Sequence, residues 1–448
     1  MNKTAAFLSL GCKVNSYETE AMRGMFEAQG YTIVDFKEIA DVYVVNTCTV
    51  TNIADRKSRQ MLHQAKKRNP EAVIAAVGCY VQASEEALLA DHAVDLVVGN
   101  NKKGDIVSMV ERCRNSNEKE ELVVDISEQR EYEELNVSTT MEKTRAFIKI
   151  QDGCNRFCSY CIIPYVRGRV RSRKEEEILS EVSELVKNGY QEIVLTGIHI
   201  SSYGTDFDRS EEEGVLASEI NPLADLIVKI GEMEGIERIR LGSLEPRIIT
   251  DEFLGKISKV RQFCPHFHLS LQSGSDSVLA RMNRKYTSQE YYDRVILIKR
   301  YFEIPSFTTD VIVGFPGETE QEFEETKNFV RNVGFYQIHV FKYSKREGTK
   351  AAEMKDQIAE ETKNRRSNEL ISLAEQLSDE YKLNFMGKME RVLFEEEIVI
   401  DGEKYQVGHT QRYLKLAVKS DQDLSNQIKQ VMICNKLADE LLLCEIIH

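Results

Sequence analysis

Three cysteines stand within eight residues in the stretch DGCNRFCSYCIIPYVRGRVRSR, which runs from Asp152 to Arg173. They are Cys154, Cys158 and Cys161, in the spacing Cys-x3-Cys-x2-Cys. Structural zinc sites and closed iron–sulfur clusters normally take four protein ligands, so three thiolates leave one metal position free for chemistry. A zinc ion completed by a distant His or Cys is the alternative. The close spacing at the mouth of a βα repeat favours a polynuclear cluster.

A second set of three cysteines is spread over the first 79 residues. Cys12, Cys48 and Cys79 each come directly after an apolar run, in FLSLGC, VVNTC and IAAVGC. The carboxyl ends of parallel strands meet at one edge of a sheet, so we expect these thiols to converge and hold a second open cluster. Three buried, inert thiols are the alternative. The remaining cysteines lack this placement and are interpreted as structural: Cys113, Cys264, Cys434 and Cys444.

The elements around these cysteines alternate between strand and helix signals. Early apolar runs at 5–10, 42–46, 72–77 and 95–99 alternate with helical segments, which predicts a parallel α/β sheet. Six further strand signals alternate with amphipathic helices and predict a partly closed βα barrel with its functional residues at the strand ends. These signals lie at 145–151, 192–197, 238–243, 267–272, 308–315 and 336–343.

The rest of the chain is predicted to form a linker, a long helix and a small C-terminal domain. Residues 114–142 are highly charged and mostly acidic, which predicts a linker, with one short strand signal at ELVVDI (121–126). A long helical pattern covers about 357–384, and the short strand signals after it predict a small β-barrel or sandwich. We therefore predict an α/β multidomain chain. Its units are 1–113, the linker 114–142, the barrel 143–371, and a β domain with its connecting helix over 372–448.

Composition limits the classes of protein to which this chain can belong. The 448 residues carry a formal net charge of −14, and the start of the chain lacks the basic and apolar regions of a signal peptide. No apolar run approaches the ~20 residues that a membrane span needs. We therefore expect a cytoplasmic protein with reduced thiols, in which clustered cysteines indicate metal binding or catalysis.

Basic residues gather in two segments despite the acidic total. Arg167, Arg169, Arg171 and Arg173 alternate, and alternate residues of an extended segment share one face. We predict that this face binds RNA phosphates beside the first cysteine set. The segment from Arg56 to Arg68 holds six Lys or Arg and no acid, and either a solvated helix face or an RNA contact explains it.

The motif DGCNRFCSYC resembles the signature of radical S-adenosylmethionine (SAM) enzymes. This resemblance implies that Cys154, Cys158 and Cys161 hold a [4Fe–4S] cluster. SAM then binds the open iron and is cleaved to a 5′-deoxyadenosyl radical.

The chain also resembles a narrower family, the methylthiotransferases, along nearly its whole length. The motifs that carry this resemblance are LGCKVNSYETE, VNTCTVTNIADRKSRQ, GCYVQ, HLSLQSGSD and RMNRKYT. That family implies a flavodoxin-like first domain, a partial (βα)6 radical SAM barrel and a C-terminal RNA-binding β domain called TRAM.

The motif variants LGCKVN, NTCTVTN, LTGIHI and RMNRKYT resemble the branch that acts on N6-threonylcarbamoyladenosine (t6A) in tRNA. The implied reaction replaces the C2 hydrogen of t6A, next to the anticodon, by a methylthio group. A second [4Fe–4S] cluster on Cys12, Cys48 and Cys79 would carry the sulfur, and SAM would supply both methyl group and radical. The alternatives are isopentenyladenosine in tRNA or a ribosomal-protein aspartate as substrate. Alternatives of another class are a two-cluster electron carrier or redox protein and a zinc-containing RNA-binding protein.

The predicted barrel and the family resemblance together indicate which residues contact SAM and RNA and which partners the enzyme needs. We expect SAM contacts at strand ends, namely Thr196, Gly197, Ser243, Glu245, Gln272, Ser273, Gly314 and Gly317. RNA contacts are expected at the four arginines and, in the C-terminal domain, at Arg412 and Tyr413. The expected partners are the tRNA anticodon loop, an electron donor such as flavodoxin or ferredoxin, and a sulfur source. A monomer is the default for this architecture, and no membrane association is expected.

Overall fold

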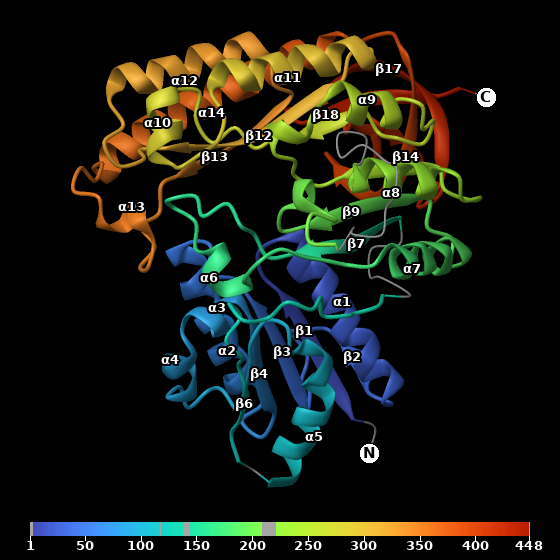
Figure 1. The fold of residues 1–448 in the computed structure, drawn as a ribbon. Helices are drawn as coiled ribbons and strands as arrows, with labels where there is room; N and C mark the ends of the chain where they lie inside the picture. Colours follow the sequence, from blue (N-terminus) through green and yellow to red (C-terminus); the bar gives the residue numbers. More distant parts are fainter. Residues whose placement is uncertain (1–2, 117, 138–143, 208–220, 448) are drawn as a thin grey trace, which may run out of the picture.

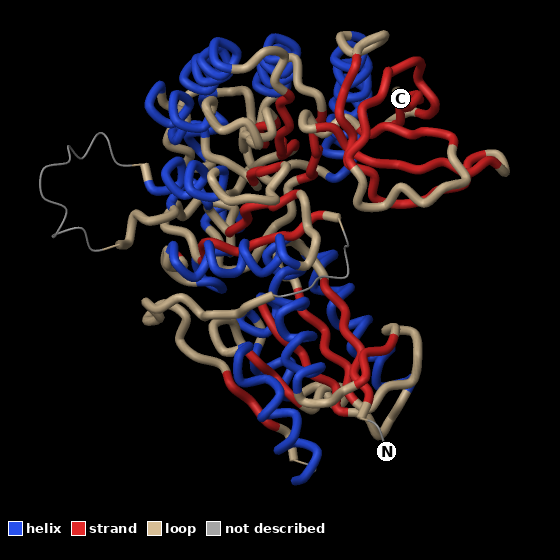
Figure 2. Tube along the Cα trace, turned by 90° about the vertical axis from the view of Figure 1, so that its right-hand side faces the viewer, coloured by secondary structure: helices blue, strands red, loops and turns tan. Residues whose placement is uncertain are grey.

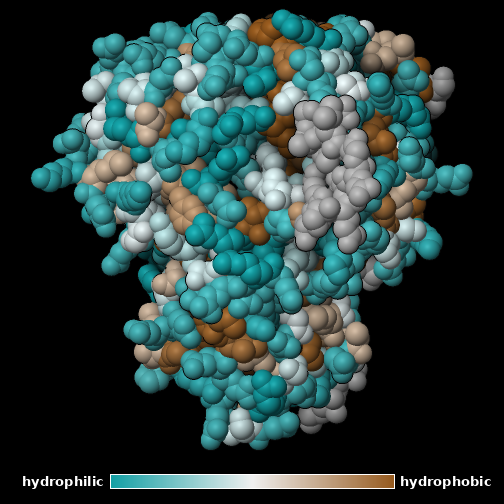
Figure 3. All heavy atoms as spheres, viewed as in Figure 1, coloured by the Kyte–Doolittle hydropathy of each residue, from teal (hydrophilic) through white to brown (hydrophobic). Residues whose placement is uncertain are grey.

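The structure, a computed structural model, describes residues 3–116, 118–137, 144–207 and 221–447. An N-terminal α/β domain lies at one end, a βα half-barrel lies in the middle, and a C-terminal β-barrel packs beside the half-barrel (Figures 1 and 2). Hydrophilic residues cover most of the face seen in Figure 3. Among the described residues, no helix is long and apolar enough to cross a membrane.

The N-terminal domain is a six-stranded parallel sheet in the order β2-β1-β3-β4-β5-β6. Its two central strands, β3 and β4, are buried at every position, which explains their continuous apolar runs. One face of the sheet packs against α1 and α5, and the other packs against α2, α3 and α4. The strands are β1 (Thr4–Ser9), β2 (Thr32–Val34), β3 (Val42–Thr47), β4 (Val73–Gly78), β5 (Leu96–Val98) and β6 (Glu120–Leu122). The helices are α1 (Lys13–Ala28), α2 (Asn52–Arg68), α3 (Cys79–Ala83), α4 (Glu85–Leu89), the 3-10 turn η1 (Lys103–Asp105) and α5 (Ile106–Ser116).

The six predicted barrel strands are all present, which confirms the predicted half-barrel. Strands β10, β9 and β7 pair in parallel, as do β11, β12 and β13. Isolated bridges at Ile239–Phe263 and Leu244–Leu269 join the two sheets. An unpredicted two-residue strand, β8, turns back antiparallel against β7. The bounds are β7 (Arg145–Asp152), β8 (Arg171–Ser172), β9 (Glu192–Gly197), β10 (Arg238–Leu241), β11 (His266–His268), β12 (Ser306–Val313) and β13 (Gln337–Lys342).

Helices cover the outer side of the half-barrel and share one apolar core with its strands. Their ends follow local sequence signals: Thr287 with Glu290 and Thr319 with Glu322 form capping boxes, and α12 ends at Gly334 in the left-handed region. The helices are α6 (Ile163–Arg167), α7 (Glu175–Lys187), α8 (Pro222–Gly231), α9 (Asp251–Ile257), α10 (Asp276–Arg281), α11 (Ser288–Tyr301), α12 (Glu320–Val333), α13 (Lys350–Glu353) and α14 (Glu360–Leu383). Two 3-10 turns, η2 (Ile200–Ser202) and η3 (Pro246–Ile248), follow β9 and β10.

The C-terminal strands close into a five-stranded barrel in the order β14-β15-β16-β18-β17, which confirms the predicted small β-barrel. Gly408 on β15 is required by close approach, since an added Cβ would lie 2.0 Å from the carbonyl oxygen of Leu393. Arg238 and Arg240 of β10 donate to backbone carbonyls of this barrel and so attach it to the half-barrel. The strands are β14 (Met389–Ile400), β15 (Glu403–Thr410), β16 (Lys415–Lys419), β17 (Ile428–Ala438) and β18 (Leu441–Ile446).

The segment predicted as a linker is more structured than its high charge suggested. Its first residues complete α5, and the ELVVDI signal overlaps β6, which joins the edge of the N-terminal sheet. Further along, Leu135 and Val137 are buried against Tyr17 and Ala21 of α1. Residues 138–142, the end of the predicted linker, lie outside the described residues, and the domain boundaries themselves stay predictions.

Candidate functional site

The first cysteine set lies in the loop that leaves the carboxyl end of β7. Gly153 begins this loop with φ +71°, and an added Cβ would lie 1.8 Å from the carbonyl oxygen of Arg169, so only glycine fits. Burial raises the pKa of Cys154 to about 11 and that of Cys161 to about 12. The Arg284 guanidinium donates to the Cys158 sulfur at 3.3 Å. This loop thus gathers three thiols beside one cation.

The second cysteine set converges at the carboxyl edge of the N-terminal sheet. Cys12 follows β1, Cys48 follows β3, and Cys79 begins α3 directly after β4. A Cβ added at Gly11 would lie 2.7 Å from the Cys48 sulfur, so the backbone before Cys12 passes directly over Cys48. Loss of solvation raises the pKa of Cys12 and raises that of Cys48 to about 11. The sequence predicted this convergence from the strand positions alone.

The whole first cysteine set and one cysteine of the second set border a cavity of about 930 Å³ between the three structural units. Cys12 lines it from the N-terminal domain, and Cys154, Cys158 and Cys161 line it from the half-barrel. The C-terminal barrel completes the lining with His409 and Lys415. The other four cysteines are elsewhere: Cys113 on α5, Cys264 before β11, Cys434 on β17 and Cys444 on β18. No described cysteine therefore supplies a fourth thiol to either set.

Five of the eight predicted SAM contacts line this cavity, and three do not. The five are Thr196, Gly197, Ser243, Glu245 and Gln272. Glu245 pairs with Arg156 at 2.6 Å and with His199 at 2.9 Å, and these partners hold the pKa of its carboxyl below the usual range despite its burial.

The other three predicted SAM contacts are not among the described residues that line the cavity, so their role in SAM binding stays a prediction. Ser273 hydrogen-bonds to Thr326 of α12 at 3.2 Å. A Cβ added to Gly314 would lie 2.3 Å from the Lys363 side chain of α14, so this glycine serves helix packing. The space around Gly317 is bordered by Arg281 and Asp356 instead. Gly314 and Gly317 belong to a segment after β12 that packs against α14, whereas Ser273 follows β11 and packs against α12.

The predicted phosphate-binding face is wrong for three of its four arginines. Arg167, Arg171 and Arg173 are fully buried, and only Arg169 is exposed. The segment is not extended: α6 ends at Arg167, Gly168 has φ +71°, and the two-residue β8 follows. The buried guanidinium groups pair inside the protein, Arg167 with Glu18 at 2.8 Å, Arg171 weakly with Asp152 at 3.8 Å, and Arg173 with Glu181.

The two predicted RNA contacts of the C-terminal domain have different positions. Tyr413 lines the cavity and stacks between His266, at 4.8 Å between ring centroids, and His409, at 4.5 Å. Arg412 is bound by its surroundings, because it donates to the carbonyl oxygen of Ile304 and pairs with Glu390 at 3.0 Å. Tyr413 therefore belongs to the site, and Arg412 joins the C-terminal barrel to the half-barrel.

Sequence reasoning missed a set of polar side chains on β11, β12 and β13. His268, Thr308, Asp310 and His339 all line the cavity. His268 contacts Thr308 at 3.0 Å and Asp310 at 3.3 Å, and Asp310 lies opposite His339 in the strand register. The available signal was the alternation of polar residues within otherwise apolar strands, since alternate residues point to one face.

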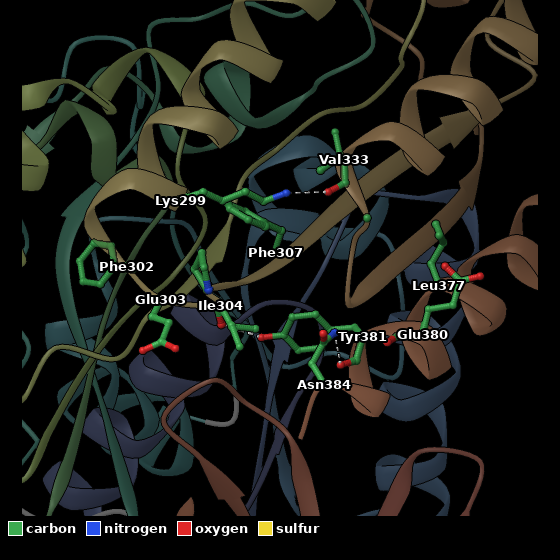
Figure 4. A pocket seen from close by; sticks show the side chains of 12 residues that line it. Lys299, Phe302, Glu303, Ile304, Phe307, Val333, Leu377, Glu380, Tyr381 and Asn384 are labelled. Atoms are coloured by element: carbon green, nitrogen blue, oxygen red, sulfur yellow. Dashed lines mark hydrogen bonds between the residues drawn. The ribbon is translucent and has the colours of Figure 1, made fainter. Parts of the chain in front are cut away.

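A second pocket, of about 510 Å³, lies where α11, α12 and α14 approach one another (Figure 4). Two of its polar side chains are engaged with the backbone, as Figure 4 shows: Lys299 donates to the Val333 carbonyl at 3.4 Å and Tyr381 donates to the Ile304 carbonyl at 3.1 Å. Neither a cysteine nor a histidine is among the described residues that line it. The chemistry therefore belongs to the cavity between the cysteine sets.

Comparison with known proteins gives the family. Residues 148–330 match the family described as "Radical SAM superfamily", and residues 4–99 match "Uncharacterized protein family UPF0004". The threonylcarbamoyladenosine tRNA methylthiotransferase MtaB of Bacillus subtilis is 43% identical, covering 96% of this chain and 93% of that protein. MtaB of Aquifex aeolicus is 40% identical, covering 89% and 95%. The chain belongs to the radical SAM methylthiotransferases.

Other relatives in the family carry a second name. The tRNA-2-methylthio-N(6)-dimethylallyladenosine synthase of Carboxydothermus hydrogenoformans is 36% identical, covering 96% of both chains. Among solved structures, the radical SAM methyltransferase TsrM of Kitasatospora setae aligns with a TM-score of 0.57 at 12% identity, covering 79% of this chain and 77% of that one. That likeness shows the fold alone. The protein is a tRNA methylthiotransferase.

Membership in the radical SAM superfamily implies a [4Fe–4S] cluster and SAM, and the site fits both. The donor set at Cys154, Cys158 and Cys161 is three thiols bordering an open cavity, with no fourth described thiol. Thiolates are the usual ligands of such clusters, and an open position suits a second, non-protein ligand. Cys12, Cys48 and Cys79 offer the same donor set, with Cys12 at the cavity and Cys48 and Cys79 buried behind it.

Proposed function

We propose that this enzyme methylthiolates C2 of t6A next to the anticodon of tRNA and produces 2-methylthio-t6A. The two relatives of 43% and 40% identity are named for that substrate, whereas those named for dimethylallyladenosine are 34–38% identical. A third relative named for t6A, from Chlamydia pneumoniae, is 37% identical, so identity alone separates the two branches weakly. The composition of one wall of the cavity carries the proposal, since aliphatic residues such as Ile198 and Leu241 line other parts of it.

The observation that supports this substrate is the polarity of one part of the cavity lining. We call this part, contributed by β11–β13 and the C-terminal barrel, the polar wall. Among the described residues it has no aliphatic member and consists of His266, His268, Thr308, Asp310, Gln337, His339, His409, Tyr413, Lys415 and Glu440. A dimethylallyl group packed against it would leave buried polar groups without hydrogen bonds. Such sites strongly reject ligands that lack the matching polar groups. The threonylcarbamoyl group, with its urea, hydroxyl and carboxylate, matches such a wall.

The chain's own residues have distinct roles in this proposal. Cys154, Cys158 and Cys161 hold one [4Fe–4S] cluster, and Cys12, Cys48 and Cys79 hold a second. When bound, these groups and SAM supply one-electron cleavage of SAM and the sulfur and methyl group of the product. The five predicted SAM contacts that line the cavity bind SAM, and the surrounding walls exclude water from the reacting carbon. Arg284 supports the anionic Cys158 thiolate.

The proposed reaction also needs partners outside the chain. Reduction of the clusters needs an electron donor such as flavodoxin or ferredoxin, and each turnover consumes one sulfur atom from a sulfur source. We propose that the enzyme acts as a monomer on the tRNA anticodon loop in the cytoplasm. The cavity supports this arrangement because all three units of one chain line it.

Mass spectrometry of tRNA nucleosides tests the proposal. In cells that lack this chain, 2-methylthio-t6A should disappear and t6A should accumulate, and expression of the chain should reverse both changes. Loss of 2-methylthio-N6-dimethylallyladenosine instead would establish the alternative tRNA substrate. No change in either nucleoside would contradict the proposal, and methylthio mass on a ribosomal-protein aspartate would then identify the remaining substrate.

A further inference from the structure

We propose that Asp310 and His339, on the neighbouring strands β12 and β13, bind the threonylcarbamoyl group and thereby select t6A-containing tRNA. This inference rests on the proposed function and assigns its substrate selectivity to two side chains. The two residues are opposite each other in the parallel register, so both point into the cavity. With His268, their ligand atoms lie within 4.8 Å of one another, which lets them hold one small polar group together.

Both side chains have hydrogen-bonding capacity to spare. Asp310 uses one carboxylate oxygen for His268, at 3.3 Å, and no residue of the described chain hydrogen-bonds to its other oxygen. Within the same described residues, neither ring nitrogen of His339 has a hydrogen-bond partner. Partial loss of solvation at the cavity lowers the pKa of His339, so its neutral ring has one donor and one acceptor at neutral pH. Asp310 is partly buried and His339 is exposed, so water occupies these hydrogen-bonding positions in the free enzyme and a polar ligand can replace it.

The chemical match is specific. A urea N–H of the threonylcarbamoyl group donates to the Asp310 carboxylate, and its carbonyl or carboxylate oxygen accepts from the His339 ring. Lys13 lines the same cavity, and its positive charge reaches His339, which favours the threonyl carboxylate. A metal ion fits less well, because both ring nitrogens of His268 already lie within hydrogen-bond distance of protein groups, Thr308 and Asp310.

Binding selectivity of the reconstituted holoenzyme tests this inference. The measurement is the ratio of Kd for tRNA carrying plain adenosine to Kd for the same tRNA carrying t6A, determined without oxygen. His339→Ala and Asp310→Asn should each lower this ratio by about 10-fold, the value of one hydrogen bond to a charged or well-placed partner. The matched control is His63→Ala, an exposed histidine paired with Asp91 on the N-terminal domain, and its ratio should equal that of the wild type.

The outcomes distinguish this inference from the proposed function. If the wild type converts t6A-tRNA but both variants keep the wild-type ratio, the selectivity inference is overturned and the proposed function stands. If the wild type does not convert t6A-tRNA at all, the proposed function fails first. A stoichiometric transition metal that is lost in His339→Ala would also overturn the inference, because the residues would then be metal ligands.

A separate observation concerns the buried charges beside Cys79. Arg167, Lys103, Lys149 and Arg171 surround only two acids, Glu18 and Asp152, and every one of these side chains is buried. Excess positive charge in a protein interior is unfavourable unless an anion lies close by. A thiolate-bound cluster is such an anion, and Arg167 already donates to the Cys79 sulfur at 3.2 Å.

We infer that Arg167 is a positioning residue that compensates the charge of the proposed second cluster and raises its reduction potential. Hydrogen bonds to cluster sulfurs and nearby positive charge both favour the reduced, more negative state. Arg167→Gln removes the charge and the hydrogen bond, and Arg167→Lys keeps the charge alone. In a redox titration followed by electron paramagnetic resonance, the potential should fall in both variants and fall further in Arg167→Gln.

Iron content and the electron paramagnetic resonance signal of the second cluster show whether each variant still holds that cluster. If Arg167→Gln retains both clusters at the wild-type potential, the inference is overturned. If Arg167→Gln loses the second cluster selectively, the potential of that cluster in Arg167→Lys decides. If Arg167→Gln fails to fold, Arg167→Lys decides, because an unchanged potential there overturns the role of the Arg167–Cys79 hydrogen bond.

Discussion

Two basic segments of similar charge have opposite positions in this molecule. The helix α2, from Asn52 to Arg68, places Arg56, Lys57 and Lys67 on the surface. The segment from Arg167 to Arg173 buries three of its four arginines in ion pairs. The sequence favoured phosphate binding for the arginine run and left Arg56–Arg68 open between an RNA contact and a solvated helix face.

The difference comes from partners that are distant in sequence. In α2, only Ser58, Leu62 and Ala65 are buried, so the helix packs through one narrow stripe. Three of its cations, Arg56, Lys57 and Lys67, are exposed and have no acidic partner among the described residues. The acids that pair with Arg167 and Arg173 lie on other elements, Glu18 on α1 and Glu181 on α7. A run of cations therefore does not show by itself whether its anionic partner is RNA or the protein.

The largest expected effect tests whether the buried arginines are structural. Arg173→Ala should destabilise the protein by about 3–5 kcal/mol, because it leaves the Glu181 carboxylate buried without its partner. The measurement is denaturant unfolding of wild type and variant. Lys174→Ala, at the adjacent exposed position, is the control and should change stability by less than about 0.5 kcal/mol. Equal effects of the two substitutions would contradict the contrast between buried and exposed cations.

A second prediction extends the comparison to Arg238 and Arg240, which pair with the buried Glu192. These arginines lower the pKa of Glu192 to about 2 from its usual 4.5. A depressed carboxyl pKa contributes stability that is fully present above pH 4.5 and is lost as the pH falls toward 2. The difference in unfolding midpoint between wild type and Glu192→Gln should therefore be constant near neutral pH and shrink below pH 4.5. A difference independent of pH would rule out this linkage.

The smallest expected effect concerns the exposed helix. If α2 contacts tRNA, Arg56→Ala with Lys57→Ala should weaken tRNA binding and leave stability unchanged. The slope of log K against log salt should become less negative by about 0.7–0.9 for each tRNA phosphate that the variant no longer neutralises. Lys37→Ala, an exposed lysine elsewhere on the N-terminal domain, is the matched control. A salt slope equal to the control would show that α2 is only a solvated face.

Much of the architecture could be predicted from the sequence, because local patterns carry it. Continuous apolar runs predicted the parallel strands, and six strand–helix repeats predicted the half-barrel. The positions of Cys12, Cys48 and Cys79 directly after three strands predicted their convergence, since parallel strands end at a common edge. These conclusions needed only spacing along the chain and the geometry of one kind of sheet.

Tertiary structure alone decided which polar groups face the cavity and which face the protein interior. Asp310 and His339 lie 29 residues apart in sequence, and only strand pairing puts them side by side. Gly314 was expected beside the cofactor, but α14 packs over it. Arg167 was expected at the surface, but α1 and β7 bring Glu18 and Asp152 to it. In each case the deciding partner comes from a distant part of the chain, which local sequence patterns do not encode.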